Sequence, residues 1–136
     1  MLKPLAAAIR FLTILPLPGG PTSDEKDFSA SLYFFAWVGL GIGAAAGFLD
    51  AALWLFFPTQ QLLCSTLVVI FLLLVTGGLH LDGLADTADG FFSSKPRARV
   101  LEIMRDSRTG PMGVAAVVCV ILLKTAVLAS LAPPSQ

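Results

Sequence analysis

The chain has 136 residues, of which 56% are hydrophobic and only 13% are charged. Soluble domains carry roughly 25% charged residues, so this composition excludes an ordinary soluble domain and favours a membrane protein. The formal net charge is zero. Because the basic residues alternate with acids along the chain, the sequence gives no support to a nucleic-acid-binding role.

Residues 1–30 predict a short interfacial helix followed by a polar loop. Lys3 and Arg10 are seven residues apart and share one helical stripe, which is typical of a helix at the membrane surface. Pro16 and Pro18 then end the apolar run. No small-residue cleavage pattern follows, so we do not interpret this segment as a signal peptide.

Three later segments are long and apolar enough to cross a bilayer: residues 31–57, 61–79 and 111–132. A spanning helix needs about 20 mostly apolar residues, and the second segment only just qualifies. The pattern predicts an all-α, polytopic integral membrane protein with three transmembrane helices plus interfacial helices, in a single membrane domain covering residues 1–136.

The distribution of basic residues predicts the orientation of these spans. If the three spans alternate, eight of the nine Lys and Arg residues fall on one side of the membrane. The positive-inside rule makes that side cytoplasmic. Residues 80–110, between the second and third spans, then form a cytoplasmic segment, and this segment contains the residues best suited to chemistry.

Three carboxylates, Asp82, Asp86 and Asp89, follow the second span at spacings of four and three. On a helix with 3.6 residues per turn, these spacings place all three within an arc of roughly 60°. Clustered carboxylates repel one another unless cations lie between them, and oxygen-rich clusters suit Mg²⁺ or Mn²⁺, which in turn bind phosphates. The three aspartates are therefore predicted metal ligands.

Other polar residues in the segment are candidate substrate contacts. His80 lies two residues before Asp82, off the carboxylate face of a continuous helix, and either contacts a substrate phosphate or makes a hydrogen bond at the helix entry. Residues 94–109 predict an amphipathic interfacial helix whose guanidinium groups are suited to phosphate oxygens. Arg105, Asp106, Ser107 and Arg108 are its candidate substrate-binding residues, and Asp106 is a further candidate metal ligand.

Four stretches together resemble the cobalamin synthase (adenosylcobinamide-GDP ribazoletransferase) family. The central one is GLHLDGLADTADG at residues 78–90, followed by LEIMRDSRTG at residues 101–110. The stretches RFLTILPLP at residues 10–18 and VGLGIG at residues 38–43 also resemble that family. The resemblance runs from about residue 9 to residue 127, and its central motif is long and specific.

The resemblance implies a multi-pass enzyme of the bacterial inner (cytoplasmic) membrane that requires Mg²⁺. It implies an enzyme that joins adenosylcobinamide-GDP to α-ribazole or its 5′-phosphate, with release of GMP and formation of adenosylcobalamin or its 5′-phosphate. Asp82, Asp86, Asp89 and His80 would then be catalytic residues. Family members are roughly twice as long, so we expect these residues to be an N-terminal portion of a family chain. Assembly into a homo-oligomer stays open.

Three other classes stay open at this point. Asp86 to Gly90 match the start of the CDP-alcohol phosphotransferase motif, although the Ala-Arg pair expected after Gly90 is absent. Asp82 and Asp86 alone match a prenyltransferase pattern weakly. A transporter or cation-binding membrane subunit would use Asp50 and Lys124 inside the membrane, but nearly all ionisable groups of this chain lie at one surface.

Overall fold

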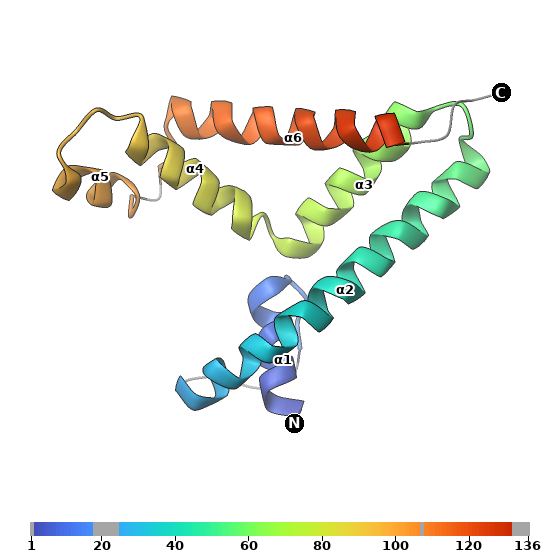
Figure 1. Cartoon of the computed structure of the whole chain (residues 1–136), viewed down its shortest axis with the longest axis horizontal. Coiled ribbons are helices and arrows are strands. Elements are labelled where there is room, and N and C mark those ends of the chain that lie inside the picture. The colour runs from blue at the N-terminus through green and yellow to red at the C-terminus, as the bar shows by residue number, and fades with distance from the viewer. Residues whose placement is uncertain (1, 18–24, 107, 132–136) are drawn as a thin grey trace. The chain divides into compact units, whose positions relative to one another are not determined.

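The computed structural model describes residues 2–17, 25–106 and 108–131, and every regular element in these ranges is a helix (Figure 1). This confirms the predicted all-α fold class. The chain divides into two compact units, with the boundary between Gly77 and Gly78. Helices α1 to α3 belong to the first unit and helices α4 to α6 to the second.

The first unit is built on a long apolar helix. Helix α2 (Glu25–Phe56) has 32 residues, packs against α1 (Leu2–Leu12), and is followed by α3 (Gln61–Thr76), which also packs against it. Its apolar part, Ser29–Phe56, is long enough to cross a membrane. The first span therefore begins two residues earlier than the predicted 31–57, inside a helix that already includes the end of the predicted loop.

Small side chains fill the contacts within this unit. Ala8, Ser31 and Cys64 are almost fully buried, whereas large apolar side chains such as Phe48 and Leu55 are about four-fifths exposed. In water such exposure would be a liability, but lipid tails are as apolar as these side chains. The first unit is therefore built with an apolar exterior, as a membrane protein requires.

Helix α3 ends earlier than predicted, because two glycines interrupt it. Gly77 and Gly78 have φ angles of +60° and +70°, and the N–H of Gly77 caps the carbonyl groups of Leu73 and Leu74. Sixteen residues rise about 24 Å, less than the hydrocarbon core of about 30 Å. The predicted span 61–79 is therefore wrong as one continuous helix, and α3 qualifies as a span only together with α4.

The second unit is formed by α4 (Leu79–Phe91), α5 (Arg97–Ile103) and α6 (Pro111–Leu131). Helices α4 and α6 pack against each other, and α5 packs against α4 (Figure 1). Helix α6 is the second apolar helix that is long enough to span on its own, which agrees with the predicted span 111–132 except that residue 132 lies outside the described residues. The described residues thus contain two such helices, or three spans if α3 and α4 form one broken span.

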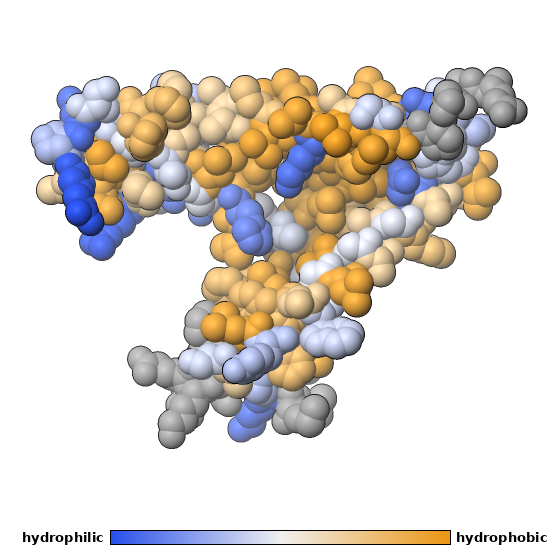
Figure 2. All heavy atoms as spheres, viewed as in Figure 1, coloured by the Kyte–Doolittle hydropathy of each residue, from blue (hydrophilic) through white to orange (hydrophobic). Residues whose placement is uncertain are grey.

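Helix α5 is much shorter than the predicted amphipathic helix 94–109. Ser94 has a φ of +54° and Pro96 an extended ψ of 151°, so the helix begins only at Arg97. It ends after seven residues. Figure 2 shows hydrophilic side chains gathered at the α5 end of this unit and apolar surface along α6. The second unit therefore combines a polar end with an apolar helix.

Candidate functional site

The three aspartates lie on one continuous helix, as predicted. Helix α4 runs without a break from Leu79 to Phe91, so the spacings of four and three place Asp82, Asp86 and Asp89 on one face. Asp82 is exposed, while Asp86 and Asp89 are half-buried. The carboxylates thus form a row, from a solvent-accessible side chain to one that lies against the neighbouring helix.

Asp89 ends this row at the beginning of α6. Its Oδ2 accepts a hydrogen bond from the Gly110 N–H at 2.6 Å, and its Oδ1 accepts one from the Gly113 N–H at 2.7 Å. The first amides of a helix have no partner within the helix, and its positive end favours a carboxylate. Asp89 therefore satisfies two amides at the N-terminus of α6, from the last turns of α4.

The fit of a divalent cation depends on how many carboxylates are available. Within the described ranges, no three His, Cys, Asp or Glu side chains are grouped closely enough to hold a metal. Mg²⁺, however, is commonly bound by one or two carboxylates, with waters and substrate phosphates completing its coordination. Asp82 and Asp86, one helical turn apart and free of the contacts that Asp89 makes to α6, fit that requirement.

His80 is exposed and is the second residue of α4. Two residues correspond to a rotation of about 200° on a helix, so His80 lies away from the face that carries Asp82. The helix begins after Gly78, whose left-handed conformation sets its direction. The structure thus agrees with the predicted placement of His80 off the carboxylate face.

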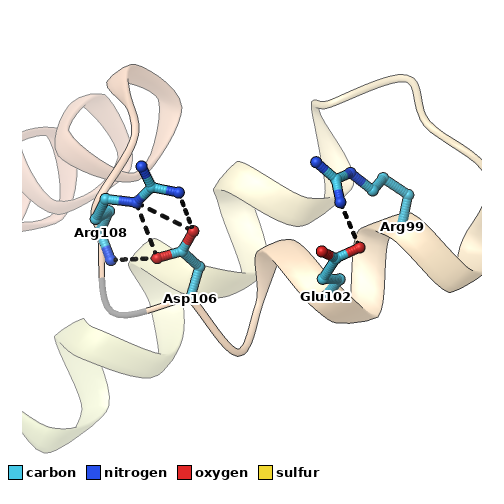
Figure 3. A network of polar contacts seen from close by, with 4 residues as sticks. All are labelled: Arg99, Glu102, Asp106 and Arg108. Atoms are coloured by element: carbon cyan, nitrogen blue, oxygen red, sulfur yellow. Dashed lines mark hydrogen bonds and ion pairs between the residues drawn. The ribbon is translucent and has the colours of Figure 1, made fainter.

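The polar segment after α4 is held against α4 by apolar contacts. A Cβ added to Gly90 would lie 2.6 Å from Cγ of Met104 and 3.2 Å from Cγ1 of Val100. Gly90, one residue before the end of α4, therefore allows α5 to approach α4 closely. On the outer side of α5, Arg99 and Glu102 form an exposed ion pair at 2.5 Å (Figure 3).

Asp106 and Arg108 form a local ion pair between α5 and α6. The Arg108 guanidinium donates hydrogen bonds from Nη2 to Oδ2 at 2.7 Å and from Nε to Oδ1 at 3.1 Å, and the Arg108 backbone N–H also donates to Oδ1 (Figure 3). These contacts hold the pKa of the Asp106 carboxyl below its ordinary value and raise the pKa of Arg108. Both groups are therefore charged at neutral pH.

Of the other candidate substrate-binding residues, Arg105 and Arg108 are exposed. Arg105 is exposed and follows directly on the end of α5. Ser107 lies outside the described residues. The side chain of Arg108 is 87% exposed and lies only two residues before Gly110, which contacts Asp89. The Asp89 contact thus brings the end of the 105–110 segment to the aspartate-bearing helix.

Sequence reasoning missed the partners of Asp89 and the contacts of Gly90. The available signal was a Gly-Pro-Met-Gly stretch at residues 110–113, at the start of a predicted span. Pro is favoured at the first position of a helix because it has no N–H to satisfy. Glycines around it indicate close approach by another group, but the sequence does not say which group approaches.

Fold and site together define an all-helical polytopic membrane protein whose polar segment carries an aspartate-bearing helix. Residues 4–135 match the family model described as Cobalamin-5-phosphate synthase. The chain belongs to that family. This finding favours the cobalamin synthase resemblance over the phosphotransferase, prenyltransferase and transporter interpretations.

Curated relatives support the same family. A protein of Herpetosiphon aurantiacus is 47% identical over 127 residues, covering 91% of this chain and 49% of the relative. A protein of Acetivibrio thermocellus is 43% identical, and the match covers 96% of this chain and 52% of the relative. A protein of Citrobacter koseri is 42% identical, and the match covers 97% of this chain and 53% of the relative. All three are named adenosylcobinamide-GDP ribazoletransferase. The chain spans about half the length of these relatives. No solved structure matches it.

Proposed function

We propose that the protein to which these residues belong transfers the adenosylcobinamide phosphate group of adenosylcobinamide-GDP to α-ribazole or its 5′-phosphate and releases GMP. In this reaction the ribazole hydroxyl oxygen forms a bond to the cobinamide-linked phosphorus. The bond from that phosphorus to the bridging oxygen of the diphosphate breaks, GMP leaves with the electron pair, and the proton of the attacking hydroxyl is released to solvent. The observation that carries the proposal is the row of carboxylates on α4 in a chain whose relatives are named for this transfer.

We assign Asp82 and Asp86 as the residues that hold Mg²⁺, with Mn²⁺ as a substitute. A bound Mg²⁺ supplies positive charge that neutralises the diphosphate oxygens. The carboxylates themselves fix where the diphosphate binds, because a divalent ion without protein ligands would leave it unoriented. Asp82 is exposed and Asp86 half-buried, so substrate reaches this end of the row from solvent.

Residues around the carboxylates contact the substrate. Arg105 and Arg108 bind phosphate oxygens, since guanidinium groups form paired hydrogen bonds with them. Arg108 exchanges its Asp106 contacts for phosphate contacts, and Asp106 keeps the side chain oriented until the substrate arrives. Ser107 and His80 complete the set of polar contacts. The segment faces the cytoplasm of a bacterial inner membrane, where nucleotide-activated substrates are available.

The test is GMP release by the full-length protein in membranes, with adenosylcobinamide-GDP and α-ribazole, in the presence and absence of Mg²⁺. We expect Asp82→Asn and Asp86→Asn each to lower turnover by about 100-fold or more, because each removes charge stabilisation at the reacting phosphate. Glu102→Gln is the matched control. It neutralises an exposed carboxylate of a surface ion pair and should leave turnover unchanged.

Wild-type turnover in both aspartate variants would exclude the assignment of these side chains. Activity that persists after complete removal of divalent cations would exclude the metal requirement. If the full-length wild-type protein releases no GMP from these substrates, the proposed reaction itself is wrong.

A further inference from the structure

Both oxygens of the Asp89 carboxylate accept hydrogen bonds at the start of α6, unlike those of Asp82 and Asp86. The two Asp89 oxygens accept the amides of Gly110 and Gly113 at 2.6 and 2.7 Å, from residues 21 and 24 positions further along the chain. Hydrogen bonds to an ionised acceptor are stronger than those between neutral groups. The contact therefore joins α4 to α6 firmly.

The position of Asp89 in its own helix also indicates that this residue joins α4 to α6. It lies two residues before the end of α4, where the negative end of the helix disfavours a carboxylate. The N-terminus of α6 reverses that disadvantage because its amides carry positive partial charge. A carboxylate at this position is thus favourable only while α6 begins beside it.

Two glycines, Gly110 and Gly113, leave the space that this carboxylate occupies. A Cβ added to Gly110 would lie 2.6 Å from Oδ1 of Asp89. A Cβ added to Gly113 would overlap Oδ2 of Asp89 and lie 2.9 Å from the carbonyl oxygen of Ala85. Real side chains essentially never approach so closely, so the absence of a side chain at both positions lets the carboxylate lie directly against the α6 backbone.

We infer that Asp89 is a positioning residue, which fixes the start of α6 and the 105–110 segment against α4, and is not a ligand of the metal. Gly110 ends the segment that carries Arg108, so the Asp89 contact sets where that guanidinium meets the phosphates. The inference rests on the proposed function for the roles of Asp82, Asp86 and Arg108. It departs from the prediction that all three aspartates bind Mg²⁺.

The first experiment compares Asp89→Asn with Gly113→Ala in the full-length protein. Asparagine keeps the size of Asp89 but presents an NH₂ group to one amide. Gly113→Ala keeps the carboxylate but places a methyl group in the space that the carboxylate occupies. We expect both variants to raise KM for adenosylcobinamide-GDP about tenfold, the size expected when one charge-assisted phosphate contact is displaced. A merely structural role would lower the amount of active enzyme without changing KM.

Binding of Mn²⁺, measured by its electron paramagnetic resonance signal, separates positioning from ligation without relying on turnover. We expect Asp89→Asn and Gly113→Ala to bind Mn²⁺ within about threefold of the wild-type affinity, while Asp82→Asn, which removes a proposed carboxylate ligand, weakens it by about tenfold or more. Weakening by Asp89→Asn as large as that by Asp82→Asn, with Gly113→Ala unaffected, would overturn the inference.

Hydrogen exchange of the wild-type protein keeps the inference testable if these variants fold poorly. The amides of Gly110 and Gly113 should be protected with or without Mg²⁺, since Asp89 holds both. Fast exchange of both amides in the metal-free protein, or loss of protection when Mg²⁺ is added, would refute it. Failure of wild-type Mn²⁺ binding would instead count against the proposed metal site and leave the exchange result to decide the role of Asp89.

Discussion

Asp106 and Arg108 form a local ion pair that, in the proposed function, orients a guanidinium for the substrate. Their charges are opposite, their contacts are short, and both side chains are accessible to solvent. An exposed pair of this kind stabilises the fold little. Its effect is on orientation, because the guanidinium is already held beside an acceptor that a phosphate oxygen can replace.

The ionisation of Asp106 gives a direct measure of this pair. In the wild-type protein we expect its pKa, followed by carboxyl-carbon NMR, to lie below the ordinary value of 3.8, chiefly because the Arg108 side chain donates hydrogen bonds to it. A lowered folded-state pKa stabilises the charged form, so the pair is intact above about pH 3.8 and is lost as the pH falls through the lowered value.

Arg108→Gln should move the pKa of Asp106 part of the way back toward 3.8, because it removes the guanidinium hydrogen bonds, the largest cause of the decrease, while the backbone N–H of residue 108 still donates. Arg97→Gln is the control, since it removes a guanidinium that does not act on Asp106, and it should leave the titration unchanged. An Asp106 titration that is identical in wild type and Arg108→Gln would show that the pair does not form in solution.

At the residue scale, sequence reasoning reached the aspartate row but not the difference among its members. The spacing of Asp82, Asp86 and Asp89 depends only on helix geometry, which is local and therefore predictable. The engagement of Asp89 depends on a contact with residues more than twenty positions away. A single sequence does not specify such a contact, because many carboxylates could cap a given helix.

The break between α3 and α4 is the most instructive feature at the element scale. Gly77 adopts a left-handed conformation, and a Cβ on it would lie only 2.6 Å from Cγ2 of Ile14. Ile14 is held there by a hydrogen bond from its N–H to the Val75 carbonyl at 2.9 Å. The chain after α1 therefore packs directly against the end of α3.

Substitution of the two glycines separates backbone strain from crowding. Gly78 is also left-handed, but a Cβ on it meets nothing within 4 Å. We expect Gly78→Ala to destabilise the protein by about 1 kcal/mol through strain alone. Gly77→Ala should cost at least about 1 kcal/mol more, because Ile14 must also move. Unfolding in detergent with increasing denaturant measures both.

The Gly77→Ala/Ile14→Ala double variant tests the cause. Removing Cγ2 of Ile14 should make the Gly77 substitution cost no more than the Gly78 one, so the two changes are non-additive. Additive costs for Gly77 and Ile14 would mean that crowding is not the reason for the glycine.

Hydrophobic length predicted where the long helices lie but not where the short ones end. The apolar spans in α2 and α6 were expected within two residues of their observed bounds, since a long apolar run has few alternatives in a membrane protein. The C-terminal end of α3 depends on Gly77, and the beginning of α5 depends on Ser94 and Pro96. Their conformations reflect packing and turn geometry, which periodicity does not capture.

At the scale of the whole molecule, the charge distribution constrains the topology. Helices α3 and α4 either cross the membrane as one broken span or enter and return on the same side. The first arrangement places eight of the nine basic residues on the side of the N-terminal segment. The second moves the five between α4 and α6 to the opposite side, against the positive-inside rule.

We therefore predict that α3 and α4 together cross the membrane. Alkaline phosphatase fused after residue 95 should be inactive, and green fluorescent protein at the same position should fluoresce, because this arrangement places residue 95 in the cytoplasm. Phosphatase fused after residue 136 should be active. A fusion after residue 60 is external in both arrangements and checks that α2 spans. An active phosphatase after residue 95 with an inactive one after residue 136 would establish the returning arrangement and place the carboxylates of α4 outside the compartment that contains nucleotide-activated substrates, so the proposed reaction would lack its substrate supply.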